Sequence, residues 1–160
     1  MASITEDLIR RLDLTPHPEG GFYREVHRST DTVQHSGNDR AALTSIYFLL
    51  AKGQHSRWHV VDADEAWHFY DGDPLELLDY DPVEESLVRT LLGPVGVPGA
   101  QPLYVVPRGH WQAATPLGSH ALAGCTVAPG FEFSDFRFVA DVGGYDDAFA
   151  RDLAAYGHLI

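Results

Sequence analysis

The stretch from Gly53 to Gly72, GQHSRWHVVDADEAWHFYDG, carries three histidines, an arginine and a glutamate among strand-forming residues. Imidazole and carboxylate groups are common ligands of divalent transition metals, and they also transfer protons near neutral pH. The stretch therefore indicates a metal site or a metal-free acid–base site, unless its side chains only pack the wall of a barrel.

Alternation along an extended strand predicts which of these side chains point together. Arg57 and His59 share one face of the first half of the stretch. In the second half Glu65 points one way and His68 the other, unless a bulge re-aims the histidine. If the two halves are hairpin neighbours, His59 and Glu65 meet across the pair near its turn.

The elements that must position these residues are mostly strands. Residues Ser3–Leu14 read as a short amphipathic helix, with Ser3 or Thr5 as its cap. Residues 41–140 read as short strands separated by Gly and Pro turn signals, which is typical of an all-β sandwich or jelly roll. A second helix is expected at about 146–156. The domain organisation we predict is one domain over 1–160, with a helix and arm strand in 1–40, a barrel in 41–140 and a helix in 141–160.

Composition excludes several classes of partner. The 23 Asp and Glu residues outnumber the 11 Lys and Arg residues, for a formal net charge of −12. Nucleic acid and anionic membranes both require a cationic face, so neither is expected as a partner. The single cysteine, Cys125, excludes a disulfide within the chain. We see no signal peptide and no apolar run long enough to span a membrane, and we expect a cytoplasmic protein.

The spacing of the 53–72 stretch resembles the first motif of the cupin superfamily. Gly53, His59, Glu65 and Gly72 fall in register with that motif, whereas Val61 occupies the position of its second histidine. The second cupin motif is matched by Pro107-Arg108-Gly109, but Gln112 stands where its histidine belongs and Pro116 where its asparagine belongs.

A closer resemblance covers most of the chain. The segments LTPHPEGGFYREVHRS, SRWHVVDADEAWHFYDGDPLEL and VVPRGHWQAA are similar to a cupin branch that is a domain-of-unknown-function family. This resemblance implies an all-β fold, the cupin-type double-stranded β-helix or jelly-roll barrel, with short N- and C-terminal helices. It implies little about activity, because one fold hosts many chemistries.

The resemblance also implies a metal alternative. Metal-binding cupins hold iron, manganese, nickel or zinc with three histidines and one glutamate, of which only His59 and Glu65 carry over. His110 shares the predicted face of Gln112 and could complete a two-histidine, one-carboxylate set, as in a dioxygenase.

We favour the metal-free alternative, because sugar-nucleotide epimerases on the cupin fold resemble this chain and need no metal. The prediction is an isomerase- or epimerase-like enzyme for a polar small molecule such as a carbohydrate derivative. His59 would be the base, Glu65 its acid partner, and His110 a further catalytic group. The predicted substrate-binding residues are Tyr23, Arg24, Arg57, Trp67, His68, Tyr70 and Gln112.

Structural interpretations of the same residues stay open. His59 and Glu65 could be a hydrogen-bonded remnant of a lost metal site, and the aromatic residues could be core, as in a non-catalytic metabolite-binding module. The segment HPEGGFYRE could line the barrel mouth through Glu19, Tyr23 and Arg24, or form an edge strand added to a neighbouring subunit. We favour the edge strand and therefore predict a homodimer.

Overall fold

The computed structural model describes residues 3–142 and 147–160. Helix α1 (Ile4–Leu12) begins at the predicted cap, since the Ser3 hydroxyl accepts the backbone N–H of Glu6 and the Glu6 carboxylate accepts that of Ser3. This reciprocal capping satisfies donors that the first turn of a helix leaves without partners.

Thirteen strands are assigned in the described residues. They are β1 (Thr15–Pro16), β2 (Phe22–Arg28), β3 (Thr32–His35), β4 (Asn38–Ala41), β5 (Thr44–Ala51), β6 (Ser56–Val60), β7 (Asp64–Gly72), β8 (Leu75–Asp81), β9 (Ser86–Leu92), β10 (Leu103–Val106), β11 (Trp111–Pro116), β12 (His120–Ala128) and β13 (Arg137–Phe138). Helix α2 (Asp147–Ala155) follows; the predicted helix start at residue 146 lies outside the described residues.

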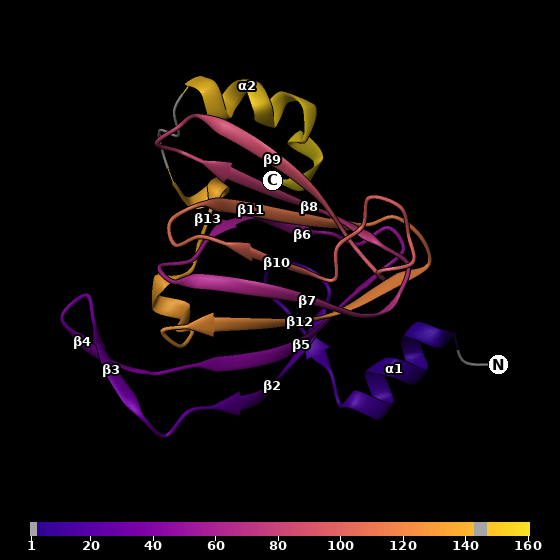
Figure 1. Ribbon diagram of the computed structural model, residues 1–160, viewed down its shortest axis with the longest axis horizontal. Coiled ribbons are helices and arrows are strands. Elements are labelled where there is room, and N and C mark those ends of the chain that lie inside the picture. Colours follow the sequence, from indigo (N-terminus) through magenta and orange to yellow (C-terminus); the bar gives the residue numbers. More distant parts are fainter. Residues whose placement is uncertain (1–2, 143–146) are drawn as a thin grey trace.

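Two antiparallel sheets face each other, as expected for a cupin jelly roll (Figure 1). One sheet has the strand order β1-β2-β5-β12-β7-β10 and the other has β13-β6-β11-β8-β9; β3 and β4 form a separate hairpin. The fold prediction is confirmed. The hairpin considered for the two halves of the 53–72 stretch does not form, because β6 pairs with β11 and β13 while β7 pairs with β12 and β10 in the opposite sheet.

Apolar side chains fill the space between the sheets and cover their outer faces. Phe48, Trp67 and Leu77 are fully buried between the sheets. The outer face of the β6–β11–β8 sheet packs against α2, where the Phe149 ring stacks on Tyr80 with centroids 4.4 Å apart. Burial of this kind is the main stabilising term in a domain of this size. Across the described ranges, the helices are too short and too polar to cross a bilayer.

Candidate functional site

A cavity of about 320 Å³ opens between the two sheets. Both residues carried over from the first cupin motif line it, His59 from β6 and Glu65 from β7. They therefore face the cavity from opposite sheets instead of meeting across a hairpin. Its polar or titratable lining residues include His17, Glu19, Tyr23, Arg24, Thr44, His59, Glu65 and Cys125.

The partner of His59 is Glu19. The His59 ring nitrogen Nε2 lies 3.2 Å from Glu19 Oε2, and its Nδ1 lies 2.6 Å from the Arg57 carbonyl oxygen. A carbonyl oxygen only accepts, so Nδ1 carries the ring proton and Nε2 presents a lone pair to Glu19. Both side chains are almost fully buried, with 1% and 6% of His59 and Glu19 exposed.

Glycine places Glu19 beside the barrel wall. Gly20 has a φ of +114°, and a Cβ there would lie 2.1 Å from the His55 carbonyl oxygen. Only glycine adopts this conformation at so close an approach. The backbone N–H of Arg57 donates to the Glu19 carbonyl at 2.9 Å, which ties the segment before β2 to β6.

Burial sets the charge of this pair. It lowers the pKa of His59 to about 4, and burial together with the nearby Glu65 carboxylate raises the pKa of Glu19 well above its usual range. Burial, reinforced by the neighbouring His59, also lowers the pKa of His17 to about 3. The charged forms are disfavoured because they lose their hydration. Burial therefore favours the neutral forms of both groups over an ion pair, with His59 Nε2 3.2 Å from the Glu19 carboxyl.

Glu65 is held by a chain of hydrogen bonds that crosses between the sheets. Gln112 Nε2 on β11 donates to Glu65 Oε2 at 2.6 Å, and Trp67 Nε1 donates to Gln112 Oε1 at 2.8 Å. Burial raises the pKa of Glu65 to about 7, against the opposing effect of hydrogen bonds from Gln112 and the Cys125 thiol. Glu65 thus exchanges its proton near neutral pH, which suits a general acid or base.

An aromatic segment, residues 131–136, covers one side of the cavity mouth. Phe131, Phe133 and Phe136 all line the cavity. Phe136 stacks on the His59 ring with centroids 5.0 Å apart, and Phe131 meets the edge of Phe133 at 4.9 Å. The wall beside the His59 imidazole is therefore a flat apolar surface that suits the face of a sugar or another ring.

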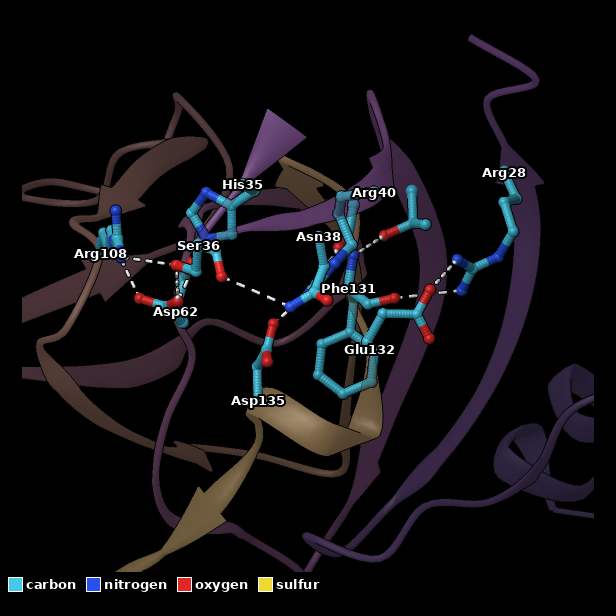
Figure 2. A network of polar contacts seen from close by, with 12 residues as sticks. Arg28, His35, Ser36, Asn38, Arg40, Asp62, Arg108, Phe131, Glu132 and Asp135 are labelled. Atoms are coloured by element: carbon cyan, nitrogen blue, oxygen red, sulfur yellow. Dashed lines mark hydrogen bonds and ion pairs between the residues drawn. The ribbon is translucent and has the colours of Figure 1, made fainter. Parts of the chain in front are cut away.

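Two arginines from the N-terminal strands hold the aromatic segment (Figure 2). Arg28 of β2 donates to Glu132 at 2.8 Å and to the Phe131 carbonyl at 3.1 Å. Arg40 of β4 donates to Asp135. Charge-assisted bonds of this kind are stronger than neutral ones, so the segment is fastened at both of its ends.

Removing the Arg40 contact is expected to loosen the aromatic segment. We expect Arg40→Ala to raise the rate of chymotrypsin cleavage within the segment roughly fivefold, because losing about 1 kcal/mol from a partly buried ion pair raises local opening by that factor. Arg108→Ala is the matched control, since its guanidinium instead donates to Asp62 at 2.5 Å and to Ser36 at 3.3 Å. Equal cleavage rates in the two variants would contradict this role of Arg40.

The structure brings only some of the predicted site residues to the cavity. Tyr23 and Arg24 line it, while Gln112 and Trp67 lie behind Glu65 in the buried chain of hydrogen bonds. His68 and Tyr70 point away from it, on the outer face of the β7 sheet, because they alternate with the inward-facing Trp67.

His110 and Arg57 also lie apart from the cavity. His110 Nδ1 is 2.8 Å from Asp79 Oδ1, in the turn before β11 begins. The Arg57 guanidinium donates to the Pro18 carbonyl at 2.8 Å and stacks on the Phe138 ring. Glu19 lines the cavity, which is the less favoured of the two interpretations of the HPEGGFYRE segment, and its place beside His59 was not predicted. The adjacent Gly20-Gly21 pair was the available signal, since it permits a close backbone approach.

The residues present do not fit the metal set of a cupin. Val61 lines the cavity where a second histidine would stand, and both ends of the Gln112 amide are engaged by Glu65 and Trp67. His110, the proposed replacement, is bonded to Asp79. Within residues 3–142 and 147–160, no group of three or more His, Cys, Asp or Glu side chains is arranged to hold a metal ion.

Two facing sheets in a jelly roll, with an inward histidine and glutamate at the positions of the first cupin motif, define a cupin. The chain belongs to the DUF985 family: the model described as "Cupin superfamily (DUF985)" matches residues 6–139.

Solved structures agree with this assignment. A hypothetical protein from Leishmania major is 34% identical, with 96% of this chain and 92% of that chain covered and a TM-score of 0.77. A Shewanella oneidensis protein is 37% identical, with 86% and 85% covered and the same TM-score of 0.77. Oxalate oxidase in complex with glycolate shares only the fold, at 16% identity over 77% and 57% of the two chains and a TM-score of 0.56. No curated protein matches the sequence.

Proposed function

We propose that this cupin is a metal-free acid–base enzyme of the isomerase or epimerase type. Its substrate would be a polar small molecule with a hydroxyl-bearing ring, bound between the Glu19 and Glu65 carboxyl groups with the aromatic segment along one side. The observation that carries the proposal is the buried contact of 3.2 Å between His59 Nε2 and Glu19 Oε2, with Glu65 on the opposite sheet from His59. Two proton-transferring groups on opposite walls are what inversion at one carbon requires.

In the proposed step Glu19 begins in its protonated form, which its raised pKa favours. One oxygen of Glu19 accepts the proton from the carbon next to a substrate carbonyl, while the proton on its other oxygen passes to His59 Nε2. The C–H electron pair becomes the enolate, and the Glu19–His59 pair gains one net positive charge. Glu65 then returns a proton from the opposite face of that carbon. The reverse reaction exchanges these roles. Because the pKa of Glu65 is about 7, Glu65 can donate a proton in one direction and accept one in the other.

Exchange of substrate hydrogen with solvent tests the proposal. A panel of aldoses, uronic acids, sugar phosphates and nucleotide sugars would be incubated with the protein in D₂O and followed by proton NMR. We expect deuterium to enter one panel member next to its carbonyl, and each of Glu19→Gln, His59→Ala and Glu65→Gln to slow this roughly 100-fold or more.

A carboxylate variant distant from the cavity, Glu84→Gln, is the control and should exchange at the unmodified rate. If all three site variants exchanged deuterium at the unmodified rate, the roles assigned to Glu19, His59 and Glu65 would be wrong. A panel member that raises the melting temperature without any exchange would instead indicate a metabolite-binding module.

A further inference from the structure

His17 is a buried titratable residue that the proposed step does not use. It lines the cavity together with Glu19, and only 5% of its side chain is exposed. Four aromatic rings surround its imidazole, with centroids between 4.5 and 6.1 Å away, and they belong to Tyr23, Phe48, Phe133 and Phe136. A hydrogen bond from this imidazole to a ligand would be strong, because apolar surroundings screen it far less than water does.

The backbone determines which nitrogen of His17 carries the ring proton. The backbone N–H of Glu19 donates to His17 Nδ1 at 3.1 Å. Because an N–H group only donates, Nδ1 presents a lone pair and the hydrogen of the neutral imidazole lies on Nε2. Among the described residues, no group accepts that Nε2 hydrogen. The wall of the cavity therefore contains a hydrogen-bond donor that is available to a ligand.

The His17 imidazole is also uncharged when the enzyme would work. Burial, reinforced by the neighbouring His59, lowers the pKa of His17 to about 3, so the ring is neutral at the pH where Glu65 exchanges its proton. Neutral imidazole is an effective donor in enzymes that form enolates. It adds no positive charge beside the Glu19–His59 pair, which itself gains one when it takes the substrate proton.

A closed turn fixes His17 beside Glu19. The backbone N–H of His17 donates to the Gly21 carbonyl at 3.0 Å, and that of Gly20 donates to the His17 carbonyl at 3.1 Å. Gly21 has a φ of +71°, and a Cβ there would lie 2.5 Å from the Leu49 carbonyl oxygen. As a result, His17 Nδ1 lies 3.8 Å from Glu19 Oε2. Two side chains held by one turn are preorganised to act on neighbouring atoms of a substrate.

We propose that His17 is a further catalytic residue, whose Nε2–H group donates a hydrogen bond to the substrate carbonyl oxygen and then to the enolate oxygen. This inference rests on the proposed function, in which Glu19 removes the proton from the carbon next to that carbonyl. Because this carbon and the carbonyl are bonded to each other, the groups that contact them must lie side by side, as Glu19 and His17 do. Negative charge develops on the oxygen as the C–H bond breaks, and the donor stabilises that charge.

No atom is transferred in this contact. The C–H electron pair forms the new C–C double bond, the carbonyl π electrons move to the oxygen, and the Nε2 hydrogen stays on His17. The oxygen therefore remains an enolate instead of becoming an enol, and the carbon stays nucleophilic enough to take the proton from Glu65. The substrate class narrows to molecules that carry a hydrogen on the carbon next to an aldehyde, ketone or carboxyl group.

Two variants separate the hydrogen-bond donor from the ring. His17→Gln keeps an N–H donor, whereas His17→Phe fills the apolar surroundings without one. In the deuterium-exchange assay, with the panel member that exchanges, His17→Phe should lower kcat roughly 100- to 1000-fold, as the loss of one oxyanion donor does. His17→Gln should be roughly tenfold faster than His17→Phe. His68→Phe, on the outer face of the β7 sheet, is the matched control and should exchange at the unmodified rate.

Nitrogen NMR tests the tautomer of His17 without a substrate. Proton–nitrogen correlation spectra of protein with isotope-labelled histidine would be recorded from about pH 5 to 8, and His17 would be assigned from its absence in His17→Gln. We expect a protonated Nε2 and a bare Nδ1 over the whole range. A doubly protonated ring, or a ring with its proton on Nδ1, overturns the proposal whatever the exchange assay gives.

The exchange rates distinguish failure of this role from failure of the proposed function. Slow exchange by His17→Phe, with partial recovery in His17→Gln, supports the role. Exchange by His17→Phe at the unmodified rate overturns the role and leaves the proposed function in place. Equally slow exchange by both variants, each shown to be folded by circular dichroism, overturns it as well and assigns the ring to packing. If the unmodified protein exchanges no panel member, the proposed function and the role of His17 are both wrong.

Discussion

Replacing Glu65 with glutamine is expected to stabilise the protein by about 3 kcal/mol above pH 7. Burial raises the pKa of Glu65 to about 7, from an ordinary value of 4.5. A carboxyl whose pKa is raised on folding contributes stability that is fully present below pH 4.5 and is lost as the pH rises through 7. Each pKa unit corresponds to about 1.36 kcal/mol, and glutamine, which cannot ionise, avoids that loss.

Urea unfolding at about pH 4, 6 and 8 would measure the difference. The variant and the unmodified protein should be equally stable at the lowest pH, and the gap should widen up to the highest. The opposing contributions of His17 and His59, whose lowered pKa values favour the folded state as the pH rises, cancel in the comparison. Glu84→Gln, at an exposed carboxylate, should show no widening gap. A flat difference for the Glu65 variant would mean that Glu65 ionises freely.

Such a gain on removing a carboxylate is a sign of function. Protein cores favour apolar or fully paired groups, and a protein keeps a buried ionisable group at a cost in stability when its chemistry uses that group. The same reasoning applies to Glu19, whose pKa burial also raises.

Local sequence patterns predicted most of the elements but not how the strands pair. The cap at Ser3 and the strand alternation depend on neighbours in sequence, and they correspond to α1 and to the barrel strands. The pairing of His59 with Gln112 and of Glu65 with Val127 depends on contacts far along the chain. In a jelly roll, successive strands cross from one sheet to the other, so closeness in sequence does not show which strands pair.

The direction of a site residue could be predicted from alternation within a strand, but not beyond the end of that strand. His59 and Glu65 kept their inward register because both lie within strands. His110 lies in the turn before β11 begins at Trp111, so alternation counted back from Gln112 no longer describes its direction. Glu19 lies in an irregular segment whose course is determined by the approach of Gly20 to β6, which periodicity does not encode.

The second large effect is expected at Gln112. Gln112→Ala should lower the free energy of unfolding by about 3 kcal/mol, because it removes the acceptor 2.8 Å from the buried Trp67 Nε1 and the amide donor 2.6 Å from the Glu65 carboxyl. Gln101→Ala, at an exposed glutamine, should change it by less than about 0.5 kcal/mol. Urea unfolding of both variants measures the contrast, and equal losses would exclude the hydrogen-bonded role.

The pH dependence of the stability lost in Gln112→Ala separates the contribution of the Trp67 hydrogen bond from that of the Glu65 hydrogen bond. The Gln112 amide favours the ionised form of Glu65, so its removal should raise the pKa of Glu65 further and make the loss greater above pH 7 than near pH 4. In the double variant with Glu65→Gln the pH-dependent part should vanish, while the part due to Trp67 remains. A loss that is independent of pH in the single variant would mean that Gln112 acts only through packing. With both parts present, the position that holds a metal-binding histidine in other cupins is here a structural amide that joins the two sheets and adjusts the acidity of Glu65.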